Sequence, residues 1–213
     1  MDNVEDLISN LAQSEAAYKH LWELTAWDKK FSGVKKSKQP TIIKYNYFLA
    51  GELIKTATEI GDVKLLGTGA ADLGVTTEEI AGEHLCEGEI VAIPWGGTPR
   101  VQYYKGKFVT GDNRIATSRD IQILNNKFLY YWMSDNLKLL TSFYRGGGLQ
   151  HPNMAKVLDM RIPVPSLRVQ EKMVSILDIF TEMETDLKTE LEARRKQFKY
   201  YRNKLLTFKE CAE

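Results

Sequence analysis

The stretch that follows Pro163 constrains this chain more than any other. Pro163 and Pro165 fix φ, lack backbone N–H donors and restrict the residues before them, so residues 162–165 are expected to be extended. Ser166 then offers an N-cap for one helix that continues to Phe208. At about 1.5 Å per residue this helix would span roughly 65 Å, a length typical of a spacer.

An apolar seam runs along this expected helix at steps that alternate between four and three residues. Only Glu184 and Arg194 interrupt the seam, which continues for about five heptads and so exceeds what a globular core helix needs. The pattern therefore predicts a coiled-coil partner. The residues expected to face that partner are Met173, Leu177, Phe180, Glu184, Leu187, Leu191, Arg194, Phe198, Tyr201, Leu205 and Phe208.

The length of 213 residues suits one globular core with one appended helix. We expect a domain over residues 1–162 and a long helix in residues 163–213. With 43% hydrophobic and 27% charged residues, the composition is that of an ordinary folded protein. No apolar run approaches the roughly 20 residues of a membrane span, and the N-terminus is acidic where a signal peptide is basic, so a cytoplasmic protein is predicted.

The stretch before Pro163 alternates expected helices and strands, which predicts an α+β fold with a mixed α/β domain. Helices are expected at residues 3–24, 46–60 and 125–140, with a short helical turn at 155–158. Strands are expected at 25–31, within 63–69 where a strand leads into a turn, within 85–94 and from 111–115 onwards. A hairpin is expected about Lys105-Gly106, and a plain turn at 67–72 is favoured over a dinucleotide-binding loop.

The net charge of +1 hides an uneven distribution. Residues 28–48 contain six lysines and one acid, and residues 91–165 contain ten basic and four acidic residues. Residues 49–90 contain nine acids and two lysines. Folding can therefore place the basic segments on one face, which predicts a surface for DNA. The alternative is that each charged run is a solvated face without a ligand.

The motifs of common enzymes are missing from the sequence. It contains no P-loop, no His-Glu-x-x-His, no Gly-x-Ser-x-Gly elbow and no Asn/Asp-Pro-Pro-Tyr/Phe tetrapeptide of amino-methyltransferases. The three histidines are scattered, and Cys86 and Cys211 are too far apart to suggest a metal knuckle or a disulfide framework. No enzyme, metal or cofactor is predicted. An enzyme with a dispersed site, such as a nuclease cluster of distant acids with Lys64, is the disfavoured alternative.

Several stretches together carry a resemblance to one family. These stretches are residues 88–100 with Gly96-Gly97-Thr98-Pro99, residues 103–109, 111–113, 127–133 and 148–154, and the junction 162–167 with Gln170 and 176–178. The chain resembles the DNA-specificity (S) subunits of type I restriction-modification systems over roughly residues 20–210. It departs from them in having Val169 where the family commonly has Glu. It also has one recognition domain and one spacer helix, where members usually have two of each, so it looks like a half-subunit.

The resemblance implies how such a chain works. In the family, two spacer helices pack antiparallel, hold the recognition domains apart and dock modification subunits. Those methyltransferase subunits use S-adenosylmethionine on adenine, and a restriction subunit is a further partner. For a half-subunit we expect a homodimer that reads a split palindrome in double-stranded DNA. Glu184 and Arg194 would then face each other across a two-fold axis near residue 189.

Candidate DNA contacts follow from residue chemistry. Phosphate contacts need cations, and base reading needs donors, acceptors or aromatic groups on loops. The expected phosphate contacts are Lys29, Lys30, Lys35, Lys36, Lys38, Arg100, Arg114 and Arg145. The expected base readers are Gln39, Trp95, Thr98, Arg100, Gln150 and His151. The alternative for Trp95 is core packing, and for Gln150 and His151 it is bracing of the helix junction.

A second class of function stays open at this point. The chain could be a stand-alone dimeric coiled-coil adaptor or a DNA-binding regulator, whose globular domain binds protein or a promoter. Substitution of the lysines at 29–38 distinguishes these functions from that of a specificity subunit. Loss of salt-dependent DNA binding with the dimer intact supports the specificity subunit.

Overall fold

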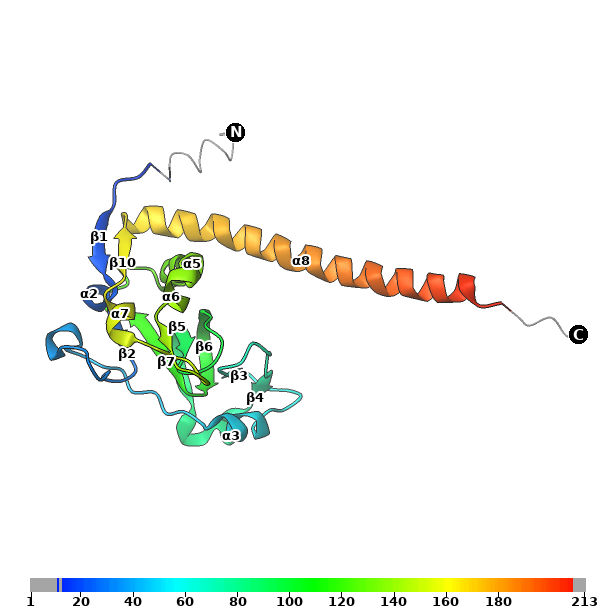
Figure 1. Ribbon diagram of the computed structural model, residues 1–213, viewed down its shortest axis with the longest axis horizontal. Helices are drawn as coiled ribbons and strands as arrows, with labels where there is room; N and C mark the ends of the chain where they lie inside the picture. Colours follow the sequence, from blue (N-terminus) through cyan, green and yellow to red (C-terminus); the bar gives the residue numbers. More distant parts are fainter. Residues whose placement is uncertain (1–10, 12, 209–213) are drawn as a thin grey trace, which may run out of the picture. The chain divides into compact units, whose positions relative to one another are not determined.

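The computed structural model describes residue 11 and residues 13–208, and it divides into two compact units (Figure 1). The first unit ends at Glu171 and contains a mixed α/β fold, and the second begins at Lys172. The expectation of a mixed domain followed by a long C-terminal helix is confirmed. The globular unit continues past residue 162, because strand β10 (Arg161–Val164) and the first turn of helix α8 (Leu167–Leu206) belong to it.

A six-stranded sheet forms the centre of the globular unit, in the order β2-β7-β5-β6-β3-β4. Neighbouring strands are antiparallel except for β3 and β6, which are parallel. The middle strand is buried from Ile90 to Pro94, so both of its faces are covered. The strands are β2 (Thr25–Trp27), β3 (Val63–Leu66), β4 (Val75–Thr76), β5 (Cys86–Pro94), β6 (Gln102–Thr110) and β7 (Asn113–Ser118).

Short helices pack around this sheet. Helix α5 (Asn126–Asp135) packs on β5 and β6, and the Asn125 side chain caps it by accepting from the N–H groups of Lys127 and Phe128 (Figure 1). The single helix expected at 125–140 is broken at Asn136, after which α6 begins. The other helices are α2 (Leu21–Leu24), α3 (Ala50–Lys55), α4 (Glu78–Ala81), α6 (Leu137–Thr141) and α7 (Met154–Leu158), with 3-10 turns η1 (Lys36–Lys38) and η2 (Gly82–His84).

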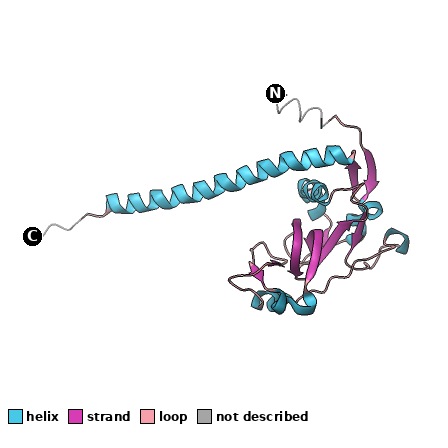
Figure 2. Cartoon of the chain, turned by 180° about the vertical axis from the view of Figure 1, so that it is seen from behind, coloured by secondary structure: helices cyan, strands magenta, loops and turns pink. Residues whose placement is uncertain are grey.

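The expected N-terminal helix is wrong for residues 17–20. These residues form strand β1 (Ala17–His20), which pairs antiparallel with β10, so that Ala17 lies opposite Val164 and His20 opposite Arg161. Figure 2 shows the two strands side by side. Among the described residues of this expectation, Leu11 and the single turn α2 are helical. Pairing with a segment about 140 residues away overrides the helical spacing of these residues. Residues 3–10 and 12 of the expected helix lie outside the described residues.

The expected hairpin about Lys105-Gly106 is also wrong. Strand β6 continues through these residues, and Gly106 lies directly opposite Gly88 of β5. The Tyr104 hydroxyl would be 3.4 Å from a Cβ placed on Gly106, so the aromatic side chain fills the space beside this glycine. The reversal occurs instead in the Gly/Pro loop between β5 and β6.

Helix α8 is continuous over 40 residues, which corresponds to about 60 Å. It ends at Leu206, so Phe208, expected as the last seam residue, lies beyond the helix and is exposed. The preceding residues 161–164 are extended, as the two prolines predict. Within the described part of the chain, no helix is sufficiently long and apolar to span a membrane.

Candidate nucleic-acid interface

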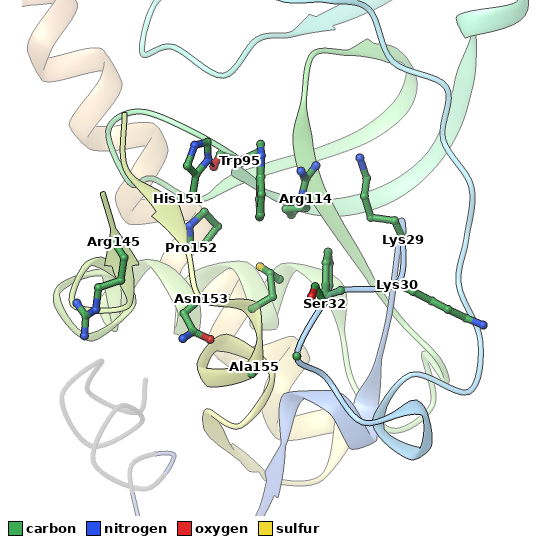
Figure 3. Close-up of a pocket in the computed structure, with 13 residues that line it drawn as sticks. Lys29, Lys30, Ser32, Trp95, Arg114, Arg145, His151, Pro152, Asn153 and Ala155 are labelled. Carbon is green, nitrogen blue, oxygen red and sulfur yellow. Dashed lines mark hydrogen bonds between the residues drawn. The ribbon is translucent and has the colours of Figure 1, made fainter. Parts of the chain in front are cut away.

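A cleft of about 630 Å³ opens on the globular unit (Figure 3). Its lining comes from residues 29–33 after β2, from Trp95 directly after β5, from Arg114 of β7, and from residues 145 and 151–155. Figure 3 shows Lys29, Lys30 and Ser32 on one side of it, with Arg145, His151 and Asn153 on the other. Five lining side chains are cationic or imidazole groups, and no described residue of the lining is acidic. The cleft therefore suits a polyanion.

Arg114 and Trp95 form the central contact of this cleft. The Arg114 guanidinium carbon lies 3.9 Å from the centre of the Trp95 ring, in a cation–π arrangement. Nη1 of Arg114 donates to Asp112 Oδ1 at 2.8 Å and to the Asn113 carbonyl at 3.1 Å. The backbone N–H of Trp95 donates to the Asp112 carbonyl at 3.0 Å. Burial of the Arg114 charge is thus offset by a carboxylate and an aromatic face.

Two carboxylates hold the cations beside the cleft in place. Asp28 is buried and accepts from the Ile115 N–H at 3.0 Å. Its burial raises the pKa of the Asp28 carboxyl, while the Ile115 hydrogen bond and the charges of Lys29 and Arg114 act in the opposite direction. The Lys29 ammonium lies 3.8 Å from Asp28 and 3.5 Å from Asp112. Lys29 and Arg114 are therefore pre-positioned before any ligand arrives.

The lysine loop between β2 and α3 divides into free and engaged residues. Lys35 and Lys36 are exposed, whereas Lys38 forms an ion pair with Asp159 and lies over the Trp22 ring. Gln39 is buried: its Oε1 accepts from the Phe31 N–H at 2.9 Å, and its Nε2 donates to the Lys29 carbonyl at 3.0 Å. Gln39 therefore holds the two ends of the loop together, and its expected base contact stays a prediction.

Arg100 is likewise engaged inside the protein. Its Nη2 donates to the Gly67 carbonyl at 2.8 Å, and burial lowers the pKa of its guanidinium. Its Nε is buried with no partner among the described residues. Gln102 donates to the same carbonyl at 3.1 Å, so both side chains hold the end of β3. The DNA contact expected of Arg100 stays a prediction, and its guanidinium already has a partner inside the protein.

The expected site residues are only partly brought together. The cleft collects Lys29, Lys30, Trp95, Arg114, Arg145 and His151. Its lining does not include Lys35, Lys36, Lys38, Gln39, Thr98, Arg100 or Gln150. Sequence reasoning missed Asp112 as the residue that holds Arg114 and Lys29. An acid two positions before an arginine on a strand lies on the same face, and that spacing could have revealed the pair.

A metal site is not evident in the described residues. Residue 11 and residues 13–208 contain no group of three or more His, Cys, Asp or Glu side chains placed to hold a metal ion. The chemistry available in the cleft is charge pairing, hydrogen bonding and aromatic contact. These are the interactions that bind a nucleic-acid backbone and its bases.

Comparison with known proteins identifies the family. Residues 42–194 match the family described as Type I restriction modification DNA specificity domain, so the chain belongs to that family. It is 36% identical over 104 residues to the EcoR124I/EcoR124II specificity subunit of Escherichia coli, and 33% identical over 136 residues to a putative type I restriction enzyme specificity subunit of Haemophilus influenzae. The expected resemblance to type I specificity subunits is therefore confirmed at the level of the family.

Solved structures agree on the fold. The S subunit of a type I restriction-modification system from M. genitalium superposes with a TM-score of 0.59 at 18% identity, over 91% of this chain and 46% of that one. A second type I structure, from work on complex assembly and conformational transition, gives a TM-score of 0.56 at 14% identity. The matched stretches cover 25% and 35% of the two curated relatives. The chain thus spans less than half the length of the proteins it matches.

Proposed function

We propose that this chain acts as a homodimer that recognises a split palindromic site in double-stranded DNA for a type I restriction-modification system. The observation that carries the proposal is the surface of α8. This surface is apolar along one seam, and the two ends of the helix have charges of opposite sign. Leu187 is 64% exposed and Phe198 is 67% exposed, although both belong to the seam. A row of exposed large apolar side chains is unfavourable in water unless a partner covers it.

The charge along α8 favours a second copy in antiparallel orientation. Residues 167–192 contain seven acids and three basic residues, whereas residues 193–206 contain six basic residues and no acid. An antiparallel copy lays each basic end beside an acidic stretch, and a parallel copy lays like charges together. The basic residues are Arg194, Arg195, Lys196, Lys199, Arg202 and Lys204.

The seam is self-complementary about residue 189. With the axis there, residues equally far from 189 in sequence face each other, so Leu187 meets Leu191 and Phe180 meets Phe198 of the second copy. Glu184 meets Arg194 in the same register. Within one chain Glu184 is 2.6 Å from Lys188, and Arg194 is 3.4 Å from Glu190. Exposed pairs of this kind contribute little, so the dimer can exchange them at small cost.

Two-fold symmetry determines what such a dimer reads. Each copy presents the same cleft and loops, so the two half-sites have the same sequence in opposite directions, separated by an unread gap. Lys29, Lys30 and Arg145 at the cleft, with Lys35 and Lys36 on the loop, supply phosphate contacts, which set the salt dependence of binding. Base contacts come from the exposed loops beside the cleft.

The catalytic work belongs to partners in this proposal. Modification subunits that bind S-adenosylmethionine dock on the helix pair and the flank of the globular unit, and a restriction subunit joins where one is present. The contribution of this chain is to bring the methyltransferase to one DNA sequence.

Sedimentation of the full chain tests the dimer. Wild-type protein should sediment as two copies of 24.3 kDa each. Leu187→Glu places a charge in the central layer of the seam and should yield monomers. Thr189→Glu is the matched control, because it adds the same charge two residues away, on the opposite side of the helix, and should leave the dimer intact. A monomeric wild-type chain rules out the homodimer.

Co-expression with modification subunits tests the DNA reading. Mapping of methylated adenines should return a palindromic motif interrupted by unspecified bases. A non-palindromic motif contradicts the homodimer model while keeping the specificity function. Sequence-specific binding without any methylation favours the regulator instead.

A further inference from the structure

Two loops that are about 50 residues apart in sequence are joined beside the basic cleft. The first follows β5 at residues 95–98, and the second joins β8 (Tyr144–Arg145) to β9 (His151–Pro152). The Gly97 N–H donates to the Gln150 carbonyl at 3.2 Å, and His151 Nδ1 is 2.7 Å from the Trp95 carbonyl oxygen. The two loops are therefore bonded to each other at two successive points.

A third contact secures the base of this pair. The buried Tyr144 hydroxyl donates to the Pro94 carbonyl at 2.9 Å, just before the first loop begins. The Trp95 indole lies between the Arg114 guanidinium, at 3.9 Å, and the His151 ring, whose centre is 4.9 Å away. The first loop is thus held from the sheet side as well as from the second loop.

Glycines permit the close approach of the two loops. A Cβ on Gly96 would be 2.9 Å from Cδ2 of the exposed Leu149 side chain and 3.3 Å from His151 Cε1, so a larger residue there would displace the Leu149 side chain. Gly146 has φ of 140°, and a Cβ on it would be 2.4 Å from the Leu149 carbonyl oxygen. Gly146 is therefore the position that requires glycine for the observed packing.

The joined loops present polar side chains outward. Thr98 and Gln150 are exposed, and neither side chain has a hydrogen-bond partner among the described residues. A glutamine amide pairs with the N6 and N7 edge of adenine, and a threonine offers a hydroxyl and a methyl group. Trp95, Arg145 and His151 directly flank residues 96–98 and 146–150 of these loops and also line the cationic cleft. Base-reading groups and phosphate-binding groups are therefore adjacent.

We propose that residues 96–98 and 146–150 form one base-reading element, with Thr98 and Gln150 as its specificity-determining residues and His151 as its positioning residue. The proposal rests on the proposed function, because it assumes that the globular unit reads DNA. Since the Gln150 carbonyl binds the Gly97 N–H, displacement of one loop moves the other. Thr98 and Gln150 then act on neighbouring bases as one unit.

The role of His151 follows from its partner. A carbonyl oxygen only accepts, so Nδ1 of His151 must be the donor in this hydrogen bond. An asparagine amide nitrogen occupies nearly the same place as Nδ1, whereas leucine fills similar volume without a donor. His151→Asn and His151→Leu form a matched pair.

The test uses the full chain and a randomised duplex DNA library, from which the wild-type protein selects its sequence. Affinity for the selected duplex is then compared with affinity for each single-base-pair variant of it. His151→Leu should lower this discrimination about tenfold, while His151→Asn retains it. Both variants remove the imidazole from the cleft, so their affinities for random duplex and their unfolding midpoints should equal each other, and only discrimination should separate them. A merely structural role predicts instead that His151→Leu loses stability and affinity for random duplex together with discrimination.

Exposed substitutions keep the test decisive if His151→Leu fails to fold. Thr98→Ala and Gln150→Ala should each relax the preference at a particular base pair, and their effects should be non-additive in the double variant. Gln122→Ala and Thr141→Ala are matched controls on exposed positions outside the element and should retain the full preference. If neither loop substitution relaxes any position, the inference is wrong. A wild-type chain that selects no sequence instead overturns the proposed function.

Discussion

The side-chain amide of Gln170 donates to the backbone carbonyl of Ile123 at 2.8 Å. The same Nε2 donates to the Pro165 carbonyl at 2.9 Å, and Oε1 accepts from the Asn125 N–H at 2.9 Å. Gln170 is fully buried in the first turn of α8, within the globular unit. One side chain thus bonds the start of the long helix to the segment that leads into α5, and its amide is satisfied on both ends.

Gln170→Leu should destabilise the globular unit. Leucine preserves most of the volume but leaves three backbone groups without their partner, so we expect a loss of about 2–3 kcal/mol in the free energy of unfolding. Urea denaturation followed by tryptophan fluorescence measures it. Gln122→Leu, at an exposed position, should lie within about 0.5 kcal/mol of wild type. Equal stability of Gln170→Leu and wild type would show that these bonds contribute nothing.

The elements that sequence predicted well are those determined by neighbours in the chain. The seam of α8 repeats every few residues, Pro163 and Pro165 act on the residues beside them, and Asn125 caps the helix that follows it. The two wrong elements depend on distant partners. Strand β1 exists because β10 pairs with it, and β6 passes straight through Gly106 because Gly88 lies opposite. Local patterns contain no information on such pairs.

For the candidate site too, local features could be predicted from the sequence, whereas features that depend on distant partners could not. Cation-rich segments can be read from composition, and the structure does bring Lys29, Arg114 and Arg145 to one cleft. Which cations are already engaged depends on partners far along the chain. Arg100 binds the Gly67 carbonyl and Lys38 pairs with Asp159, partners that lie 33 and 121 residues away in the sequence. Composition alone could not separate them from the exposed Lys35 and Lys36.

Lys35→Gln with Lys36→Gln should weaken DNA binding without changing the sequence preference. Each exposed lysine that neutralises a phosphate contributes about 0.9 to the slope of log affinity against log salt, so the double variant should lower that slope by roughly 1.8 per recognition domain. Fluorescence anisotropy over a salt series measures it. Lys138→Gln, an exposed charge removal on α6, is the control and should leave the slope unchanged. Identical slopes for the loop variant and wild type contradict the phosphate role.

The free energy of unfolding of Asp28→Asn should increase relative to that of wild type as pH rises. Because burial raises the pKa of Asp28 above its value of 3.8 in the unfolded chain, the folded state holds the proton more tightly. The stability from this group is therefore fully present below pH 3.8 and is lost as pH rises through the raised pKa. The asparagine oxygen can still accept from the Ile115 N–H and has no charge to bury. The urea midpoints of the two proteins are measured at a series of pH values from 3.8 upwards. The midpoint of the variant should rise relative to that of wild type, and a difference that stays constant with pH would contradict the prediction.

Charge reversal at Glu184 and Arg194 tests the register of the proposed dimer. Glu184→Arg should weaken the dimer because two arginines then face each other across the axis, and Glu184→Arg with Arg194→Glu should restore it. Glu182→Arg makes the same charge change two residues away, on the outward face of the helix, and should leave the dimer intact. The dissociation constant from sedimentation equilibrium compares all four proteins. Because Lys188 and Glu190 pair with these residues within one chain, each single reversal also disturbs its own helix. Recovery in the double variant therefore distinguishes a contact between copies from a local effect, and its failure places the axis elsewhere.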